Sequence, residues 1–184
     1  MSGTLNHDFI MRLAIVRPSL QHLSSYLECI EEMRVLGETI WPSRQPGAEE
    51  SGQAFVHRVL VKETAPEPPS VPESVFWGVV EGHVVGVIAF RHHLNEQLSQ
   101  FGGHIGYEVR PSCRRRGVAT ALLRLVLATD RAKLMQRILV TCAPTNEASR
   151  KSIEANGGVL TGIVYSEQAK RETCHYWIDL GGRS

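Results

Sequence analysis

The sequence predicts a mixed α/β fold in which a mostly antiparallel sheet is flanked by helices. Two runs rich in valine and aromatic residues, 75–80 and 84–90, flank Glu81-Gly82-His83 and are typical of a β-hairpin. In the second half of the chain, strand-like and helix-like segments alternate, which is typical of a sheet covered by helices. The chain has 184 residues, of which 42% are hydrophobic. We therefore expect one domain over residues 1–184.

The first half of the chain contributes short elements and a stiff connection before the hairpin. The expected order is a flexible start over 1–9, a strand over 11–17, a helix over 20–33, a loop over 37–52 and a helix over 53–62. Pro18 ends the strand, and Ser19 is a suitable cap for the first helix. The proline-rich segment 64–74 cannot form a regular helix or a central strand, so it predicts a surface connection.

The second half of the chain contains the alternating strands and helices. The expected elements are a polar loop over 91–103, a strand over 104–110, a turn over 111–116, a helix over 118–133, a strand over 138–142, a helix over 147–155, and two final strands over 158–166 and 174–180. Periodic leucines favour the first of these helices, and β-branched residues favour the strands.

Composition excludes several classes of protein. Lys plus Arg is 20 and Asp plus Glu is 19, so the net charge is +1 and no global field attracts nucleic acid or an anionic membrane. No apolar run is long enough to span a bilayer, and the N-terminus lacks the apolar region of a signal peptide. The scattered cysteines predict reduced thiols, with no disulfide framework and no metal site. We therefore expect a cytoplasmic protein with neither a nucleic-acid nor a membrane partner.

The most informative segment is the turn that leads from a strand ending at Val109 into the helix at Val118. The turn is cationic over 114–116 and then small, with Gly117 and Ala119. A glycine lets backbone approach a ligand closely, and free amides at a helix N-terminus favour anions. Together these features predict a phosphate cradle.

Other interpretations of this loop remain open from the residues alone. It is neither a Walker A loop nor a Rossmann fingerprint, because the required glycine patterns are absent. It is compatible with a surface arginine run at a helix start, or with a nucleic-acid patch. The arginines oppose the helix dipole unless an anion is present, and the neutral overall charge disfavours nucleic acid.

Two motifs resemble the GNAT superfamily of N-acetyltransferases. Arg114-x-x-Gly117-x-Ala119 is similar to its R/Q-x-x-G-x-G/A signature, and Asn146-Glu147-Ala148-Ser149 resembles its second motif, N-x-x-S/A. The string His104-Ile105-Gly106-Tyr107 and the string Asn156-Gly157-Gly158 look like a bacterial branch of predicted acetyltransferases.

The resemblance implies a sheet splayed between strands 104–110 and 138–142, with acetyl-CoA as cosubstrate in the gap. The pyrophosphate would bind the turn and the first helical residues, which are Arg114, Arg115, Arg116, Gly117, Val118, Ala119 and Thr120. The pantetheine arm would bind backbone near Val109 on one side and Asn146 on the other.

The base and the acid of such a reaction have several candidates. Family members often carry glutamate in an E-I-G-Y string where this chain has His104, and histidine suits a base at neutral pH. Glu108 is the next candidate, on the same strand face. A structural histidine is the alternative for His104. Where many members carry an acid tyrosine, this chain has Ile153, so Ser149 becomes the expected acid. Tyr107 and Tyr165 are weaker alternatives.

These residues lead to one preferred function and one alternative. We expect a coenzyme A-dependent N-acetyltransferase that acts on a primary amine by direct attack in a ternary complex. The alternative is a non-catalytic acyl-CoA-binding module, which the missing tyrosine favours. Acidic residues over 28–50 favour a cationic small molecule as acceptor, and a homodimer is compatible with the resemblance.

Overall fold

The computed structural model describes residues 8–167 and 170–181. The elements in chain order are β1 (Ala14–Val16), α2 (Leu20–Val35), η1 (Pro42–Arg44), α3 (Gly52–Val61), β2 (Glu73–Val80), β3 (His83–Arg91), α4 (Glu96–Gln100), β4 (Ile105–Val109), η2 (Pro111–Cys113), α5 (Val118–Leu127), α6 (Asp130–Lys133), β5 (Arg137–Cys142), α7 (Glu147–Glu154), β6 (Val159–Ser166) and β7 (Arg171–Asp179).

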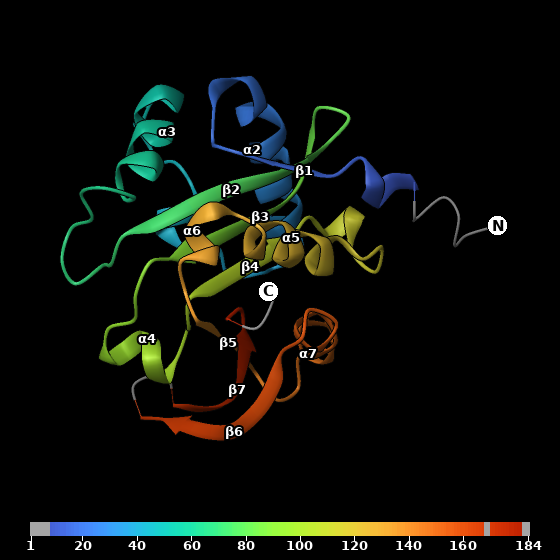
Figure 1. Cartoon of the computed structure of the whole chain (residues 1–184). Coiled ribbons are helices and arrows are strands. Elements are labelled where there is room, and N and C mark those ends of the chain that lie inside the picture. Colours follow the sequence, from blue (N-terminus) through green and yellow to red (C-terminus); the bar gives the residue numbers. More distant parts are fainter. Residues whose placement is uncertain (1–7, 168–169, 182–184) are drawn as a thin grey trace.

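The strands form one 7-stranded sheet in the order β1-β2-β3-β4-β5-β7-β6. Every neighbouring pair is antiparallel except β4 and β5, which are parallel. Figure 1 shows the twisted sheet between its helices, with β6 and β7 curving away from the first four strands. The predicted fold class, a mixed and mostly antiparallel sheet flanked by helices, is confirmed.

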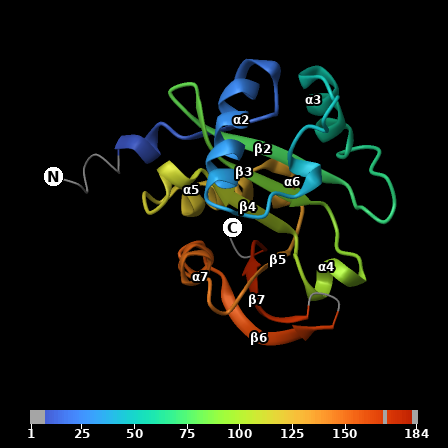
Figure 2. The same ribbon diagram turned by 180° about the vertical axis from the view of Figure 1, so that it is seen from behind.

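Two hydrophobic clusters cover the two faces of the sheet. On one face α2 and α3 pack on β2 and β3, and Tyr26 stacks between Phe55 and Trp77. On the other face α5 packs through Leu122 and Leu123, both fully buried. Figure 2 shows from behind how α2 and α3 lie over the β2–β3 hairpin while α7 lies beside β5 and β6.

Several boundaries differ from the sequence prediction for local reasons. The helix expected over 118–133 divides into α5 and α6, because the hydroxyl of Thr129 accepts a hydrogen bond from the amide of Ala132 and starts a new helix. The expected polar loop contains α4, which Asn95 caps in the same way. Of the start expected to be flexible, residues 1–7 lie outside the described residues, whereas residues 8–11 are helical.

The sheet is splayed where β4 meets β5. β4 pairs with β3 along its whole length, from Ile105 to Val109, but its register with β5 is limited to Ile105 opposite Val140. Beyond that pair the two strands separate toward their C-terminal ends. The expected gap between strands 104–110 and 138–142 is therefore present.

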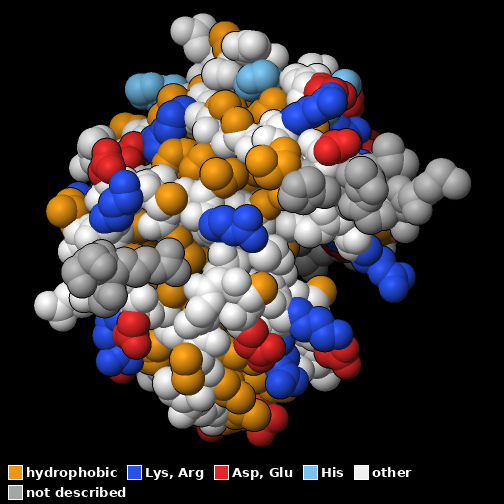
Figure 3. All heavy atoms as spheres, turned by 45° about the vertical axis from the view of Figure 1, so that its right-hand side comes forward, with side chains coloured by type: hydrophobic (Ala, Val, Ile, Leu, Met, Phe, Trp, Pro, Cys, Tyr) orange, Lys and Arg blue, Asp and Glu red, His pale blue; other side chains and the backbone are white. Residues whose placement is uncertain are grey.

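On the face drawn in Figure 3, Lys and Arg side chains lie beside Asp and Glu side chains, and no broad patch of one charge forms. Within residues 8–167 and 170–181, no helix is long and apolar enough to cross a membrane. Over the same residues, no group of three or more His, Cys, Asp or Glu side chains is arranged to hold a metal ion.

Candidate active site

A cavity of about 470 Å³ opens where the sheet splits. Tyr107 and Glu108 of β4 line one wall, and Cys142 at the end of β5 lines the opposite wall together with Asn146 and Ser149 of α7. The other lining residues come from η1, α4, β2, β3, β4, β5 and β7 or from the loops beside them: Trp41, Ser43, Arg44, Glu73, Arg91, Gln97, Leu98, Phe101, Gly102, Gly106, Thr141, Ala143 and Arg171. The splay therefore gathers side chains from segments that are far apart in the sequence.

The predicted phosphate cradle has the expected backbone. Gly117 caps α5 in the left-handed conformation, with φ of 84°, which only glycine adopts without strain. The first intrahelical bond into this cap runs from the amide of Ala121 to the carbonyl of Gly117. The amides of Val118, Ala119 and Thr120 therefore have no intrahelical acceptor, as at any helix start.

The arginines of the cradle differ in what they contact. Arg114 donates two hydrogen bonds to the carboxylate of Glu38, over 2.5 and 2.7 Å, and its Nε donates to the carbonyl of Val109 over 3.1 Å. The guanidinium of Arg116 lies 3.5 Å from the centre of the Phe9 ring. Arg115 is exposed and has a positive φ of 59°. Arg115 is thus open to solvent two residues before the cap at Gly117.

Asn146 has a structural task at the start of α7. Its Oδ1 accepts a hydrogen bond from the amide of Ser149 over 3.0 Å and so caps the helix. The same residue lines the cavity. Its position is therefore fixed by the fold, and its amide nitrogen is the group left to donate to a ligand.

Tyr107 and Ser149 form a hydroxyl pair in the wall of the cavity. The Oη atom of Tyr107 lies 2.8 Å from Oγ of Ser149. Burial raises the pKa of Tyr107 to about 12, so its hydroxyl stays protonated at neutral pH. Ile153, at the position of the family tyrosine, is fully buried in the core and does not line this cavity.

Glu108 lines the cavity, and one of its carboxylate oxygens is unsatisfied. Its Oε2 is buried and has no hydrogen-bond partner among the described residues. The nearby hydroxyl of Tyr26 has a raised pKa, mainly through burial and partly through the negative charge of Glu108. Burying a carboxylate oxygen without a hydrogen-bond donor costs free energy unless a ligand supplies the donor. A general base is expected to have such an oxygen available for a proton of the substrate.

His104 occupies a different environment from the one predicted. Its side chain is only 5% exposed and does not line the cavity. Its Nδ1 accepts a hydrogen bond from the amide of Leu139 over 2.9 Å, and its ring meets Trp177 edge-on. Burial lowers its pKa to about 4. This geometry favours the structural interpretation of His104 over the prediction that it is the base.

The acidic residues that favoured a cationic acceptor have partners of their own. Glu28 and Glu32 bind Arg110. The remaining contacts of this kind are Glu31 with Arg34, Glu38 with Arg114, and Glu50 with Arg58. None of these glutamates lines the cavity at the splay. They therefore provide no ground for a cationic acceptor.

The cavity contains three cationic residues that were not predicted as site residues, Arg44, Arg91 and Arg171. They come from three separate segments, and no local motif connects them. The segment 37–52 was predicted only as a loop, and the presence of Trp41 and arginine within it was the available signal.

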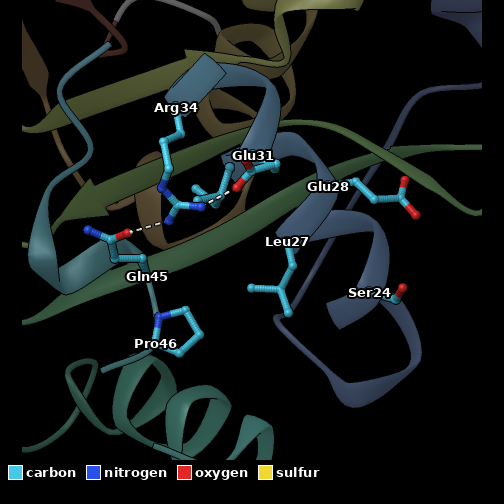
Figure 4. Close-up of a pocket in the computed structure, with 8 residues that line it drawn as sticks. Ser24, Leu27, Glu28, Glu31, Arg34, Gln45 and Pro46 are labelled. Atoms are coloured by element: carbon cyan, nitrogen blue, oxygen red, sulfur yellow. Dashed lines mark hydrogen bonds and ion pairs between the residues drawn. The ribbon is translucent and has the colours of Figure 1, made fainter. Parts of the chain in front are cut away.

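A second hollow, of about 530 Å³, lies on the surface of α2. Figure 4 shows Arg34 reaching between Glu31 and Gln45, with Leu27 and Pro46 beside them. Because the guanidinium is already bound on both sides, and none of the predicted site residues lines this hollow, we place the candidate active site at the splay.

The fold and this site define an acyltransferase: a mixed sheet split at two parallel strands, with a glycine-started helix at the mouth of the split. The sequence matches the family described as Acetyltransferase (GNAT) family over residues 38–157. The chain belongs to the GNAT family of acetyltransferases. A comparison with curated proteins finds no match.

Solved structures show the same fold at low sequence identity. The microcin C7 self-immunity acetyltransferase MccE, in complex with acetyl-CoA and AMP, is 13% identical with a TM-score of 0.66, covering 91% of this chain and 92% of that one. Mycobacterium smegmatis RimJ in complex with CoA-disulfide is 19% identical with a TM-score of 0.62, covering 91% and 81%. A GNAT-family acetyltransferase from Bacillus anthracis is 20% identical with a TM-score of 0.62, covering 92% and 95%.

Proposed function

We propose that this protein transfers an acetyl group from acetyl-CoA to a primary amine of a small molecule, by direct attack in a ternary complex. The observation that carries the proposal is the unsatisfied carboxylate oxygen of Glu108 in a cavity continuous with the split between β4 and β5. Family membership supports the acetyl transfer, and the cavity supports the roles of individual residues.

The residues present fit acetyl-CoA. The amides of Val118, Ala119 and Thr120 suit the pyrophosphate, because a helix N-terminus favours anions. Arg115 adds a cation. The carbonyl of Val109 would exchange the Nε donor of Arg114 for an amide of the pantetheine arm, and the side-chain nitrogen of Asn146 would donate from the opposite wall.

Glu108 is the base in this proposal. When bound, acetyl-CoA supplies a thioester carbonyl as electrophile. An amine is protonated at neutral pH and attacks only after it loses a proton, which Glu108 Oε2 accepts directly or through a water. The new C–N bond replaces the C–S bond, so a thiolate leaves.

The hydroxyl pair of Tyr107 and Ser149 returns a proton to the sulfur. The pair connects β4 to α7, and Cys142 at the end of β5 lines the same cavity. Ser149 retains the role expected from its motif, and Tyr107 supports it by a hydrogen bond. Since both hydroxyls are neutral at pH 7, either one can donate to a developing negative charge.

Release of coenzyme A, followed with a thiol reagent against a panel of amines, tests this function. Glu108→Gln should lower kcat/KM by about 10² or more, with the acetyl-CoA dissociation constant from calorimetry nearly unchanged. Glu31→Gln, on the exposed face of α2, is the matched control. Tight acetyl-CoA binding without release from any amine would favour the non-catalytic module instead.

A further inference from the structure

We infer that the acceptor carries an anionic oxygen group, a carboxylate or a phosphate, in addition to its amine, and that Arg44 binds this group. The inference rests on the proposed function and specifies the chemical class of its acceptor. It follows from the positions of one cation and one anion in the cavity at the splay.

The guanidinium of Arg44 has a nitrogen donor without a hydrogen-bond partner among the described residues. Its Nη1 is buried and has no hydrogen-bond partner among the described residues, although the residue lines the cavity. The backbone of Arg44 is held firmly: its amide donates to the carbonyl of Trp41 over 2.8 Å, and its carbonyl accepts from the hydroxyl of Tyr26. Tyr26 in turn stacks on Trp77 with ring centres 4.4 Å apart. The residue is therefore anchored in place.

The other cations of the cavity are already engaged. Arg91 donates to the carbonyls of Gly102 and Gly103, each over 3.1 Å, and lies 3.7 Å from the carboxylate of Glu73. The guanidinium of Arg171 lies over the ring of Phe101, 4.3 Å from its centre. Among these three arginines of the cavity, Arg44 is the one with a buried donor nitrogen that has no hydrogen-bond partner within residues 8–167 and 170–181.

Arg44 and Glu108 do not form an ion pair with each other. No ion pair of 4.0 Å or less joins them, and each keeps a buried polar atom without a partner. Burying an unpaired charge is costly, and the cost increases when a ligand excludes water from the cavity. A ligand with an ammonium or amine toward Glu108 and an anion toward Arg44 satisfies both groups at once.

A neutral or purely cationic amine would satisfy only Glu108. It would leave the guanidinium of Arg44 desolvated, and sites with buried polar groups discriminate strongly against ligands that leave them unpaired. Arginine also binds carboxylate and phosphate oxygens through paired, charge-assisted hydrogen bonds. The volume of about 470 Å³ is in the range of small-molecule sites.

Matched acceptor pairs test the inference. ω-Amino acids of increasing length are compared with alkylamines of the same length, and phosphoethanolamine is compared with ethanolamine. For the wild type we expect kcat/KM to be at least about 10² higher for the anionic member of the best pair. Arg44→Gln should reduce that ratio to less than about 10, whereas Arg44→Lys should retain part of it. Arg34→Gln, at the hollow on α2, is the control and should leave the ratio unchanged. The two series distinguish a carboxylate from a phosphate.

A readout without turnover separates this inference from the proposed function. With coenzyme A present, the preferred anionic amine should raise the melting temperature of the wild type and not that of Arg44→Gln. Equal kcat/KM within every pair, or an unchanged ratio in Arg44→Gln, would overturn the inference while leaving amine acetylation intact. Anion-dependent stabilisation without release of coenzyme A would support the inference and contradict the proposed function.

Discussion

The amide of Leu139 donates a hydrogen bond to Nδ1 of His104 over 2.9 Å, at the place where β4 and β5 begin to separate. The backbone amide of His104 in turn donates to the carbonyl of Leu139 over 2.8 Å. The imidazole of His104 therefore supplies a hydrogen-bond acceptor for a backbone amide at the end of the β4–β5 ladder. Because Nδ1 must keep its lone pair for this contact, the imidazole is neutral in the folded protein.

This contact predicts a loss of stability at mildly acidic pH. The pKa of His104 falls from 6.5 to about 4 on folding, so between those values the unfolded chain binds a proton that the folded chain does not. Stability should therefore be complete above pH 6.5 and decrease as the pH falls toward 4, by roughly 3 kcal/mol at most for this group. Urea unfolding at several pH values measures the decrease.

The variant His104→Gln keeps an acceptor near Leu139 and removes the titration. Its free energy of unfolding should depend less on pH between 6.5 and 4 than that of the wild type. Parallel curves for the two proteins would show that His104 does not cause the acid sensitivity. Its kcat/KM at pH 7.5 should stay within a few-fold of the wild-type value, since the side chain lies outside the cavity.

The cap of α5 predicts a defined effect on cofactor binding. Acetyl-CoA at 100 times its dissociation constant should raise the melting temperature by about 5–10 °C. Gly117→Asp should abolish this rise, because a carboxylate would stand where the pyrophosphate binds. Gly82→Asp is a matched control, since Gly82 also has φ of 84° but lies in the β2–β3 turn with open space around it. If acetyl-CoA raised the melting temperature of Gly117→Asp as much as that of the wild type, the predicted phosphate cradle would be wrong.

The arginines of the cradle should contribute unequally to cofactor affinity. Arg115→Gln removes the solvent-exposed cation beside the cap at Gly117 and should raise the acetyl-CoA dissociation constant about 10-fold or more, as for a charge-assisted hydrogen bond. Arg114→Gln should raise it less, because Arg114 is already bound to Glu38. Calorimetry on both variants at two salt concentrations gives the comparison. The reverse order would mean that Arg114 leaves Glu38 when the cofactor binds.

The pair of Tyr107 and Ser149 should behave as one unit. Ser149→Ala and Tyr107→Phe should each lower kcat, and the double variant should be little worse than the more damaging single variant, because either change breaks the same 2.8 Å contact. Additive losses in the double-mutant cycle would indicate that the two hydroxyls act independently. Acetyl-CoA affinity, measured in parallel, should change little in all three proteins.

Local pattern was sufficient to predict most of the fold. The hairpin over 75–90 and the cap at Gly117 depend on neighbours in the sequence, and the structure confirms the hairpin, the turn and the helix that follows. The break between α5 and α6 was missed because apolar periodicity continues past Thr129, and only a hydroxyl that caps a new helix interrupts it.

The site was harder to predict because it depends on contacts between distant segments. Sequence alternation placed His104 and Glu108 on one strand face, yet it could not show that Leu139 engages the first and that the second meets an open cavity. Arg44 carries no motif at all. The position of Arg44 depends on Tyr26, which donates a hydrogen bond to the carbonyl of Arg44 from another helix.

The single register pair of Ile105 and Val140 joins two parts of the sheet, and this junction is a seam between two units. Strands β1–β4 form one continuous ladder and β5–β7 form another, and across the seam α5 also packs on α7. Contiguous ladders open and close as units, so the smaller unit with β5–β7 is the one whose amides should exchange with deuterium first. A cofactor that hydrogen-bonds to both β4 and β5 would link the two units. The gain in protection of the β5 amides from deuterium exchange would then measure how far the two units close on the bound cofactor.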